Sequence, residues 1–198
     1  PGLDDALTAM GEGRSALRPQ VWDGSYEPVE YYAQRVGNPP SALGLSRLEG
    51  MMAAALTDCA IGNKPRGSRR AGLIISTTKG NISEAGAEPP EAGSRVFLHT
   101  MGLRVARAAG LEADPLVISN ACISGVAAVV VASRLIRHGE YDDIFVLGAD
   151  ELSRFVVSGF LSFRSVSRRP CLPFDLRRDG LSLGEAAGCI LLTNNAEC

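Results

Sequence analysis

The sequence predicts an α/β layered fold with a largely buried sheet, and three observations support it. Short apolar runs of strand length alternate with segments of helical periodicity along most of the chain. Of the 198 residues, 45% are apolar and 21% are charged, which is ordinary globular composition. No internal repeat or low-complexity tract interrupts this pattern. Alternation of this kind places a sheet between layers of helices.

The predicted elements follow in a regular order. Helical spacing covers residues 3–10, 45–60, 94–109 and 121–137, and Gly110 and Gly139 are the expected helix stops. Compact apolar runs predict strands at 71–76, 116–119, 143–147 and 186–193. The segments between them read as loop-rich (11–44), polar turn (61–70), long loop (77–93), mixed (151–167) and loop (168–184). Long loops in compact domains are often functional.

Composition excludes several functional classes. The net charge of −2, from 20 basic and 22 acidic residues, argues against a nucleic-acid partner. No apolar run reaches the roughly 18 residues that a membrane span needs, and no signal peptide is visible. The five cysteines contain no C-x-x-C pair, so we expect no metal site and a reducing, cytoplasmic compartment. A start at Pro1 and an end soon after the last predicted strand suggest part of a longer protein.

Two motifs are better read as turns. Gly11 to Ala16 fits the loose G-x-G-x-x-A dinucleotide pattern but lacks the preceding strand. Gly180 to Gly184 fits the hydrolase elbow G-x-S-x-G, yet no histidine follows Ser182. The only histidines, His99 and His138, are expected to be structural or exposed.

Cys122 is the candidate nucleophile. It follows the strand predicted at 116–119, where a long helix is expected to begin. Unpaired N–H groups at a helix start favour the thiolate, and the N–H of Cys122 itself could donate to an oxyanion. The alternative is a buried, inert cysteine, which is the commonest fate of a free thiol.

Three motifs together resemble the amino-terminal half of a β-ketoacyl-acyl-carrier-protein synthase of the thiolase superfamily. Ser119 to Gly125 (SNACISG) resembles the nucleophile motif, and Gly159-Phe160 with Arg164 and Ser167 resembles a segment beside the acyl pocket. Pro170 to Gly188 resembles the family's P-F-D, R-D-G and G-E-x-A-G signature. Ile75 to Asn81 is similar to a bacterial branch associated with aryl-polyene pathways.

The resemblance implies a layered αβαβα fold, of which residues 1–198 form the amino-terminal domain. It also implies a role for each motif. Cys122 takes an acyl group from a carrier-protein thioester, and its N–H supplies one oxyanion donor. Phe160, Phe163 and Ile123 are expected at the acyl pocket. The acidic residues Asp175, Asp179 and Glu185 are expected to brace loops.

The resemblance also implies partners. No cofactor is expected, because substrates arrive on the phosphopantetheine of acyl-carrier protein. A homodimer or a related synthase subunit is expected. The carrier protein is acidic, so docking is expected at the basic turn, which contains Lys64, Arg66, Arg69 and Arg70, or at Arg168 and Arg169.

Departures from the family pattern limit the expected activity. The first strand and the carboxy-terminal half, which carries two catalytic histidines and a lysine, are apparently absent. We therefore predict a decarboxylating condensing enzyme as the complete protein, with this chain inactive in elongation. The alternatives are a silent, chain-length-factor-like partner, an isolated structural half, or a thiolase-fold enzyme acting on coenzyme A substrates. Apolar surface is expected to be exposed at 144–147 and 186–193, so association is expected.

Overall fold

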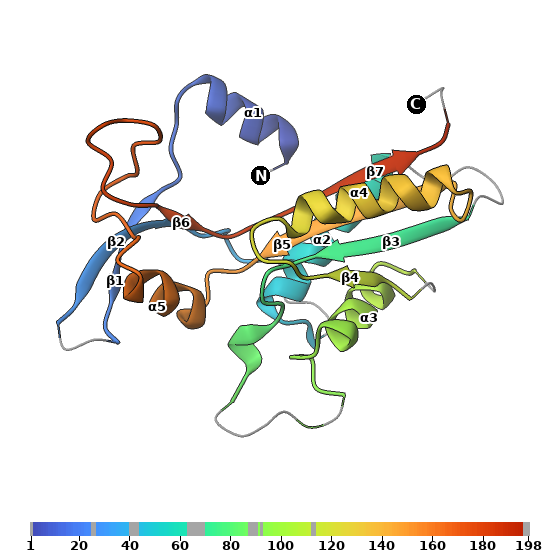
Figure 1. Ribbon diagram of the computed structural model, residues 1–198, viewed down its shortest axis with the longest axis horizontal. Coiled ribbons are helices and arrows are strands. Elements are labelled where there is room, and N and C mark those ends of the chain that lie inside the picture. The colour runs from blue at the N-terminus through green and yellow to red at the C-terminus, as the bar shows by residue number, and fades with distance from the viewer. Residues whose placement is uncertain are drawn as a thin grey trace. The chain divides into compact units, whose positions relative to one another are not determined.

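The computed structural model describes residues 2–24, 27–39, 44–62, 70–86, 91, 93–111 and 114–195. Contacts divide the chain into two compact units. Unit 1 comprises residues 1–36 and 152–185, and unit 2 comprises residues 37–151 and 186–198. Each unit has its own small sheet. Helices and strands alternate through unit 2, as the α/β prediction requires (Figure 1).

Unit 2 is built on a four-stranded mixed sheet in the order β4-β3-β5-β7. Its strands are β3 (Ala71–Ser76), β4 (Leu116–Ile118), β5 (Asp143–Asp150) and β7 (Ala186–Thr193). The first three are parallel, whereas β7 runs antiparallel to β5. Its helices are α2 (Arg47–Gly62), η2 (Ile82–Glu84), α3 (Leu98–Ala108) and α4 (Ser124–Arg137).

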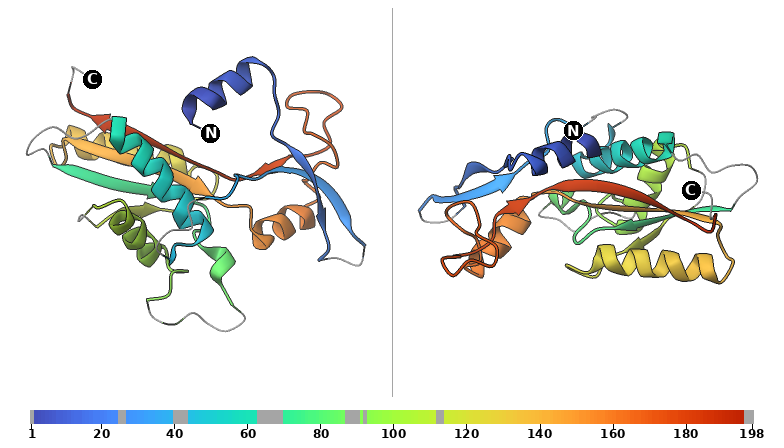
Figure 2. Two further views of the ribbon diagram at one scale, coloured as in Figure 1. Left: turned by 180° about the vertical axis from the view of Figure 1, so that it is seen from behind. Right: turned by 90° about the horizontal axis from the view of Figure 1, so that it is seen from above.

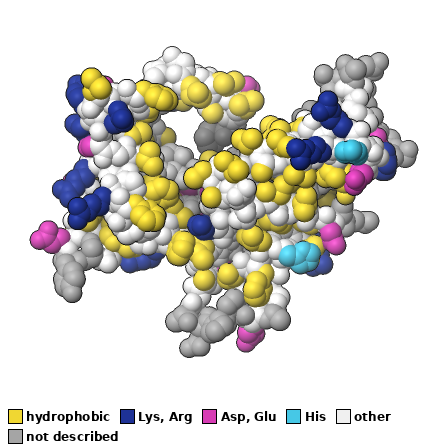
Figure 3. Space-filling view, in the orientation of Figure 1, with side chains coloured by type: hydrophobic (Ala, Val, Ile, Leu, Met, Phe, Trp, Pro, Cys, Tyr) yellow, Lys and Arg dark blue, Asp and Glu magenta, His cyan; other side chains and the backbone are white. Residues whose placement is uncertain are grey.

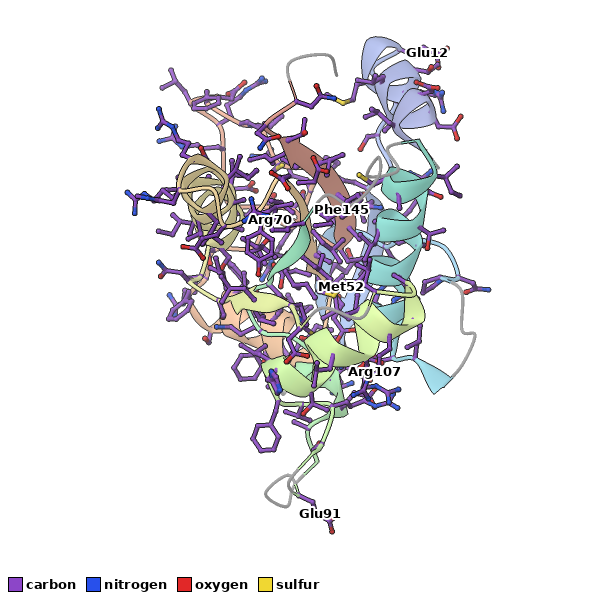
Figure 4. The ribbon with its side chains drawn as sticks, turned by 90° about the vertical axis from the view of Figure 1, so that its right-hand side faces the viewer. Glu12, Met52, Arg70, Glu91, Arg107 and Phe145 are labelled. Atoms are coloured by element: carbon purple, nitrogen blue, oxygen red, sulfur yellow. The ribbon has the colours of Figure 1, made fainter. Side chains whose placement is uncertain are left out.

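Helices cover both faces of this sheet. The helix α4 lies on one face, and α2 and α3 lie on the other (Figure 2). On the α4 face, Ala128 and Ala132 pack against Ile144 and Val146. On the opposite face, Met52 of α2 and Phe145 of β5 lie in the interior between helix and sheet (Figure 4). Side chains that alternate along β5 therefore enter two separate apolar layers.

The structure corrects the expected location of exposed apolar surface. Residues 144–147, expected to be exposed, are at most 5% exposed because helices cover both sides of β5. On β7, Ile190 is exposed, but Leu191 and Leu192 are half-buried. The larger apolar surface lies on α4, where Val126, Val129 and Val130 face outward (Figure 3).

Unit 1 contains a three-stranded sheet in the order β1-β2-β6. Its elements are α1 (Leu3–Gly11), β1 (Arg18–Trp22), β2 (Val29–Gln34), α5 (Arg154–Ser162) and β6 (Leu183–Gly184). The prediction of loop for 11–44 is thus wrong over β1 and β2, which pair antiparallel as a hairpin. The burial pattern of β1 is irregular, so its periodicity gives little strand signal. Pairing with β6 and a small apolar cluster stabilise the hairpin.

Other boundaries move by a few residues. The segment 151–167 contains α5, whose start is capped by the Ser153 side chain accepting from the Val156 N–H. The helix expected from residue 94 begins at Leu98 as α3. No helix among the described residues is long and apolar enough to cross a membrane.

Candidate active site

Cys122 lies on the turn that joins β4 to α4, at the carboxyl edge of the parallel strands. Its thiol is exposed, so the interpretation as a buried, inert cysteine is wrong. The helix predicted from residue 121 begins only at Ser124, because Ala121 has a φ of 46°, which a right-handed helix does not accommodate. Cys122 therefore precedes the helix instead of lying in its first turn. A non-glycine residue with positive φ beside a candidate nucleophile is typical of a functional turn.

Ser124 holds this turn in place. Its buried hydroxyl accepts a hydrogen bond from the Asn120 N–H at 2.8 Å and donates to the Ala121 carbonyl at 2.7 Å. The two bonds bracket the strained residue Ala121. In the sequence, Ser124 stood out only as part of the motif Ser119 to Gly125. In the structure, its side chain is the polar group that fixes the backbone just before the nucleophile.

The loop after β3 is fastened to the same edge of the sheet. The carboxylate of Asp150, at the end of β5, accepts from the Thr77 hydroxyl at 3.0 Å and from the N–H and hydroxyl of Thr78, both at 2.8 Å. The Ser119 hydroxyl donates to the Thr78 carbonyl at 3.1 Å. The ends of β3, β4 and β5 are thus tied together beside Cys122. The exposed Lys79 follows Thr78 on this loop.

A buried polar network at the start of α2 holds the loop that follows β3. Ser46 and Glu49 form a capping box at the start of α2: the Ser46 N–H donates to Glu49, and the Glu49 N–H donates to the Ser46 hydroxyl. The side-chain amide of Asn81 donates to Glu49 at 2.9 Å, and Arg104 of α3 donates to the same carboxylate at 3.0 Å. Glu49 is fully buried, and these contacts compensate its charge. Apart from the S-x-x-E spacing of Ser46 and Glu49, no local sequence pattern predicts this network.

The residues expected at the acyl pocket are divided between the two units. Ile123 lies next to Cys122 in unit 2 and is 57% exposed. Phe160 and Phe163 belong to unit 1. Phe160 packs against the apolar cluster of that unit, and Phe163 is 79% exposed. The acyl-pocket assignment stays a prediction.

The three acidic residues of the signature all lie in unit 1 and accept hydrogen bonds. Glu185 is fully buried and accepts from the N–H groups of Val36 at 2.9 Å and Leu152 at 3.1 Å. Asp179 accepts from the Ser167 hydroxyl at 2.6 Å and lies 3.2 Å from the Arg169 guanidinium. Hydrogen bonds from the side chain and backbone of Arg177 lower the pKa of Asp175.

Unit 1 also contains an open groove of about 790 Å³. Trp22 and Leu161 give it an apolar wall, and Arg164, Arg168 and Asp179 also line it. Arg154 lies 4.8 Å from the centre of the Trp22 ring. The groove is therefore lined by both apolar and charged side chains.

Several candidate residues lie elsewhere. His138 caps the carboxyl end of α4, and since that helix has 14 residues it lies roughly 21 Å along the axis from the end near Cys122. His99 is exposed in the first turn of α3. Gly11 ends a helix, with no strand before it, and the Ser182 hydroxyl accepts from the Cys171 N–H ahead of β6. Of the predicted basic turn, Arg70 pairs with Asp142, whereas Lys64, Arg66 and Arg69 lie outside the described residues.

The family is decided by a sequence match that includes this site. Residues 49–197 match the model of the β-ketoacyl synthase N-terminal domain, and this segment contains Cys122 and its supporting loops. The chain belongs to the β-ketoacyl synthase family. This is a family of acyltransferases, and the match confirms the resemblance to the amino-terminal half of these synthases. The mixed α/β fold of unit 2 agrees with a thiolase-like ketosynthase.

Curated relatives include enzymes of polyketide and fatty-acid synthesis. The ketoacyl synthase alpha subunit of the tetracenomycin polyketide synthase from Streptomyces glaucescens is 30% identical over 164 residues, covering 70% of this chain and 38% of that protein. The 3-oxoacyl-[acyl-carrier-protein] synthase 2 of Vibrio cholerae is 32% identical over 90 residues, covering 42% of this chain and 22% of that protein. The chain therefore spans well under half the length of these relatives.

Solved ketosynthases share the fold. A ketosynthase in complex with its chain length factor from Xenorhabdus doucetiae is 25% identical, with a TM-score of 0.80 over 97% of this chain and 54% of that one. A β-ketoacyl synthase from Burkholderia phymatum is 22% identical, with a TM-score of 0.78 over 99% of this chain and 56% of that one. This β-ketoacyl synthase chain thus corresponds to about half of each solved chain.

Proposed function

We propose that the complete protein is a decarboxylating β-ketoacyl-acyl-carrier-protein synthase and that this chain is its nucleophile-bearing half. The observation that supports this most directly is the exposed Cys122 on a strained turn, held by Ser124 at the carboxyl edge of the sheet. An accessible thiol at a fixed position is what acyl transfer requires of a nucleophile. A subunit without catalysis would have no use for this arrangement.

In the proposed first half-reaction, the Cys122 thiolate attacks the carbonyl carbon of an acyl thioester carried on phosphopantetheine. The backbone N–H of Cys122 donates to the oxyanion that develops on the carbonyl oxygen. The C–S bond to the carrier breaks, the carrier leaves as a thiol after taking a proton, and the acyl group remains on Sγ. The exposed, apolar side chain of Ile123, next to Cys122, is expected to border the incoming chain. The roles of Phe160 and Phe163 at the acyl pocket stay predictions.

In the proposed second half-reaction, a malonyl thioester loses its carboxylate as carbon dioxide. The electron pair of the broken C–C bond becomes a carbanion, which attacks the acyl carbon on Cys122 and forms the new C–C bond. The Cys122 sulfur then leaves as a thiolate. Donors that stabilise the enolate are needed here, and His99 and His138 lie in the wrong places to act. We therefore expect this chain alone to accept an acyl group without elongating it.

The proposal extends to partners and to the loops of unit 1. An acidic acyl-carrier protein is expected to use Arg168, which is exposed at the rim of the groove in unit 1. Arg169 is less suitable, because its guanidinium already pairs with Asp179. Asp175, Asp179 and Glu185 are assigned to bracing, since their oxygens accept from nearby backbone or side-chain donors. A homodimer or a related synthase subunit, and an aryl-polyene-type pathway, stay predictions.

The test is intact-protein mass spectrometry before and after incubation with cerulenin, which modifies acyl-accepting cysteines of these enzymes. We expect one adduct on the unaltered chain, its loss in Cys122→Ala, and its retention in Cys171→Ala, a matched control in which a half-buried thiol is removed. Absence of the adduct in a complete protein would favour the silent partner subunit. Release of carbon dioxide from malonyl-carrier protein by the 198-residue chain at a synthase's normal rate would contradict the assignment to one half.

Ser124 gives a second test of the same site. Ser124→Ala removes the bonds to Asn120 and Ala121, so Cys122 loses its fixed position. We expect acylation of Cys122 to slow by about tenfold to a hundredfold, because small misplacements of reacting groups have effects of this order. Thr57→Ala, at an exposed position of α2, serves as control and should leave the rate unchanged. An unchanged rate of Cys122 acylation in Ser124→Ala would contradict the positioning role of Ser124.

A further inference from the structure

Two cysteines that play no part in the proposed chemistry face each other across the interior of unit 2. Cys59 lies on α2, and Cys189 lies on β7. Within the ladder, Cys189 is the partner of Leu147, while Ile190 and Leu192 pair with Val146 and Ile144. Paired residues of adjacent strands project from the same face of a sheet. Because Val146 and Ile144 face α4, Cys189 projects from the opposite face, toward α2.

The two thiols are in direct contact. The Cys189 thiol forms a hydrogen bond with Cys59, and both residues are half-buried free thiols. Burial raises the pKa of the Cys189 thiol, and the neighbouring Cys59 raises it further. The hydrogen bond makes the two thiols neighbours, as a disulfide between them requires. The helix and strand that carry them pack directly on each other.

We propose that Cys59 and Cys189 form a reversible disulfide that ties α2 to β7 when the protein meets a peroxide. In the first step, the Cys59 sulfur attacks one oxygen of hydrogen peroxide, the O–O bond breaks, and a sulfenic acid and water form. In the second step, the Cys189 sulfur attacks the sulfenic sulfur, the S–O bond breaks and the S–S bond forms. The hydroxyl leaves as water with the proton from Cys189. Two thiols and one peroxide thus give one disulfide and two waters.

The bond closes a long loop around the site. The chain between the two cysteines includes β3, α3, β4, α4 and β5, and therefore the turn of Cys122. Closing a long loop lowers the entropy of the unfolded chain and stabilises the folded one. The oxidised form is expected to unfold at a higher temperature than the reduced form. Reduction by a dithiol reverses the change.

The test uses the Cys122→Ala chain, so that the exposed nucleophile does not consume the peroxide. After hydrogen peroxide treatment we expect the chain to lose the mass of two hydrogen atoms, and subsequent alkylation should label only Cys171 and Cys198. Peptide mapping should recover the Cys59 and Cys189 peptides as one cross-linked species that dithiothreitol separates. The thermal unfolding midpoint should rise on oxidation and return on reduction.

Matched variants make the result decisive. Cys59→Ser and Cys189→Ser should each abolish the cross-link and the shift in unfolding midpoint, whereas Cys171→Ser should leave both intact. Cross-links through Cys171 or Cys198 instead, or oxidation of Cys59 to a sulfinic or sulfonic acid without a cross-link, would overturn the proposal. Peptide mapping of the Cys122→Ala chain gives this answer even where a serine variant fails to fold. The outcome does not depend on whether Cys122 is an acyl acceptor.

Discussion

The two units are stabilised in different ways. In unit 2 the interior is apolar: β3 and β5 are almost wholly buried, and the side chains of β5 alternate between two helical layers. In unit 1 the apolar cluster is small, and much of the order comes from polar side chains that bind backbone groups, Glu185 first among them. The candidate site of unit 2 therefore lies at a sheet edge held by apolar packing, whereas the loops of unit 1 depend on single hydrogen bonds.

The largest expected effect is in unit 2. Phe145→Ala removes a side chain that is 2% exposed between the sheet and α2, and we expect a loss of about 3–5 kcal/mol in the free energy of unfolding. Phe174→Ala, at a fully exposed phenylalanine, is the control and should change stability by less than about 0.5 kcal/mol. Hydrogen exchange should show lost protection in β3, β5 and β7. Equal loss in β2 and α5 would break the distinction between the units.

The next effect belongs to unit 1. Glu185→Ala leaves the N–H groups of Val36 and Leu152 without this carboxylate acceptor, at an expected cost of about 2–4 kcal/mol. Glu185→Gln keeps the shape and one acceptor oxygen, so it should cost less. Exchange protection should fall first in β2 and at the start of α5. If β3 and β5 lose protection to the same extent, the two units unfold together.

Two glycines of unit 1, Gly180 and Gly159, differ in whether their backbone accepts a side chain. Gly180 has a φ of 151°, and a Cβ there would lie 2.6 Å from the Ser167 nitrogen, so Gly180→Ala should cost about 1–3 kcal/mol. Gly159 lies within α5 with nothing within 4 Å of the equivalent position, so Gly159→Ala should stabilise by about 0.5–1 kcal/mol. Denaturant unfolding of both variants measures the contrast. A Gly180→Ala variant at least as stable as the unaltered chain would show that backbone geometry at Gly180 does not matter.

The smallest effect concerns pH. Hydrogen bonds from the Arg70 backbone and side chain, and from Asn194, lower the pKa of Asp142 below its ordinary value of 3.8. Because the folded-state pKa is depressed, this contribution to stability is present above the ordinary value and is lost as the pH falls through the folded-state value. Asp142→Asn should therefore be slightly less stable at neutral pH, with the difference disappearing in acid. Thermal unfolding at a series of pH values tests this, and a difference that grows in acid would contradict it.

The sequence by itself predicted most elements of unit 2 and the candidate nucleophile Cys122. The strands at 71–76, 116–118 and 186–193 were predicted almost to the residue, because buried strands are uninterrupted apolar runs. Cys122 was found from its place between such a run and a helix. The boundary of that helix was missed by three residues, because the positive φ of Ala121 leaves no mark on an apolar pattern.

Only the tertiary structure decided the rest. The hairpin of β1 and β2 was missed because the burial pattern of β1 is irregular. The hairpin's pairing with β6 joins residues about 150 positions apart, a contact that local periodicity does not encode. Local periodicity likewise does not reveal the hydrogen bonds from Thr77 and Thr78 to Asp150, or the contact of Cys59 with Cys189. Periodicity reports which face of an element is buried. The partner that buries that face is set by how distant segments pack. In this chain, that packing forms the carboxyl edge of the sheet at which Cys122 lies.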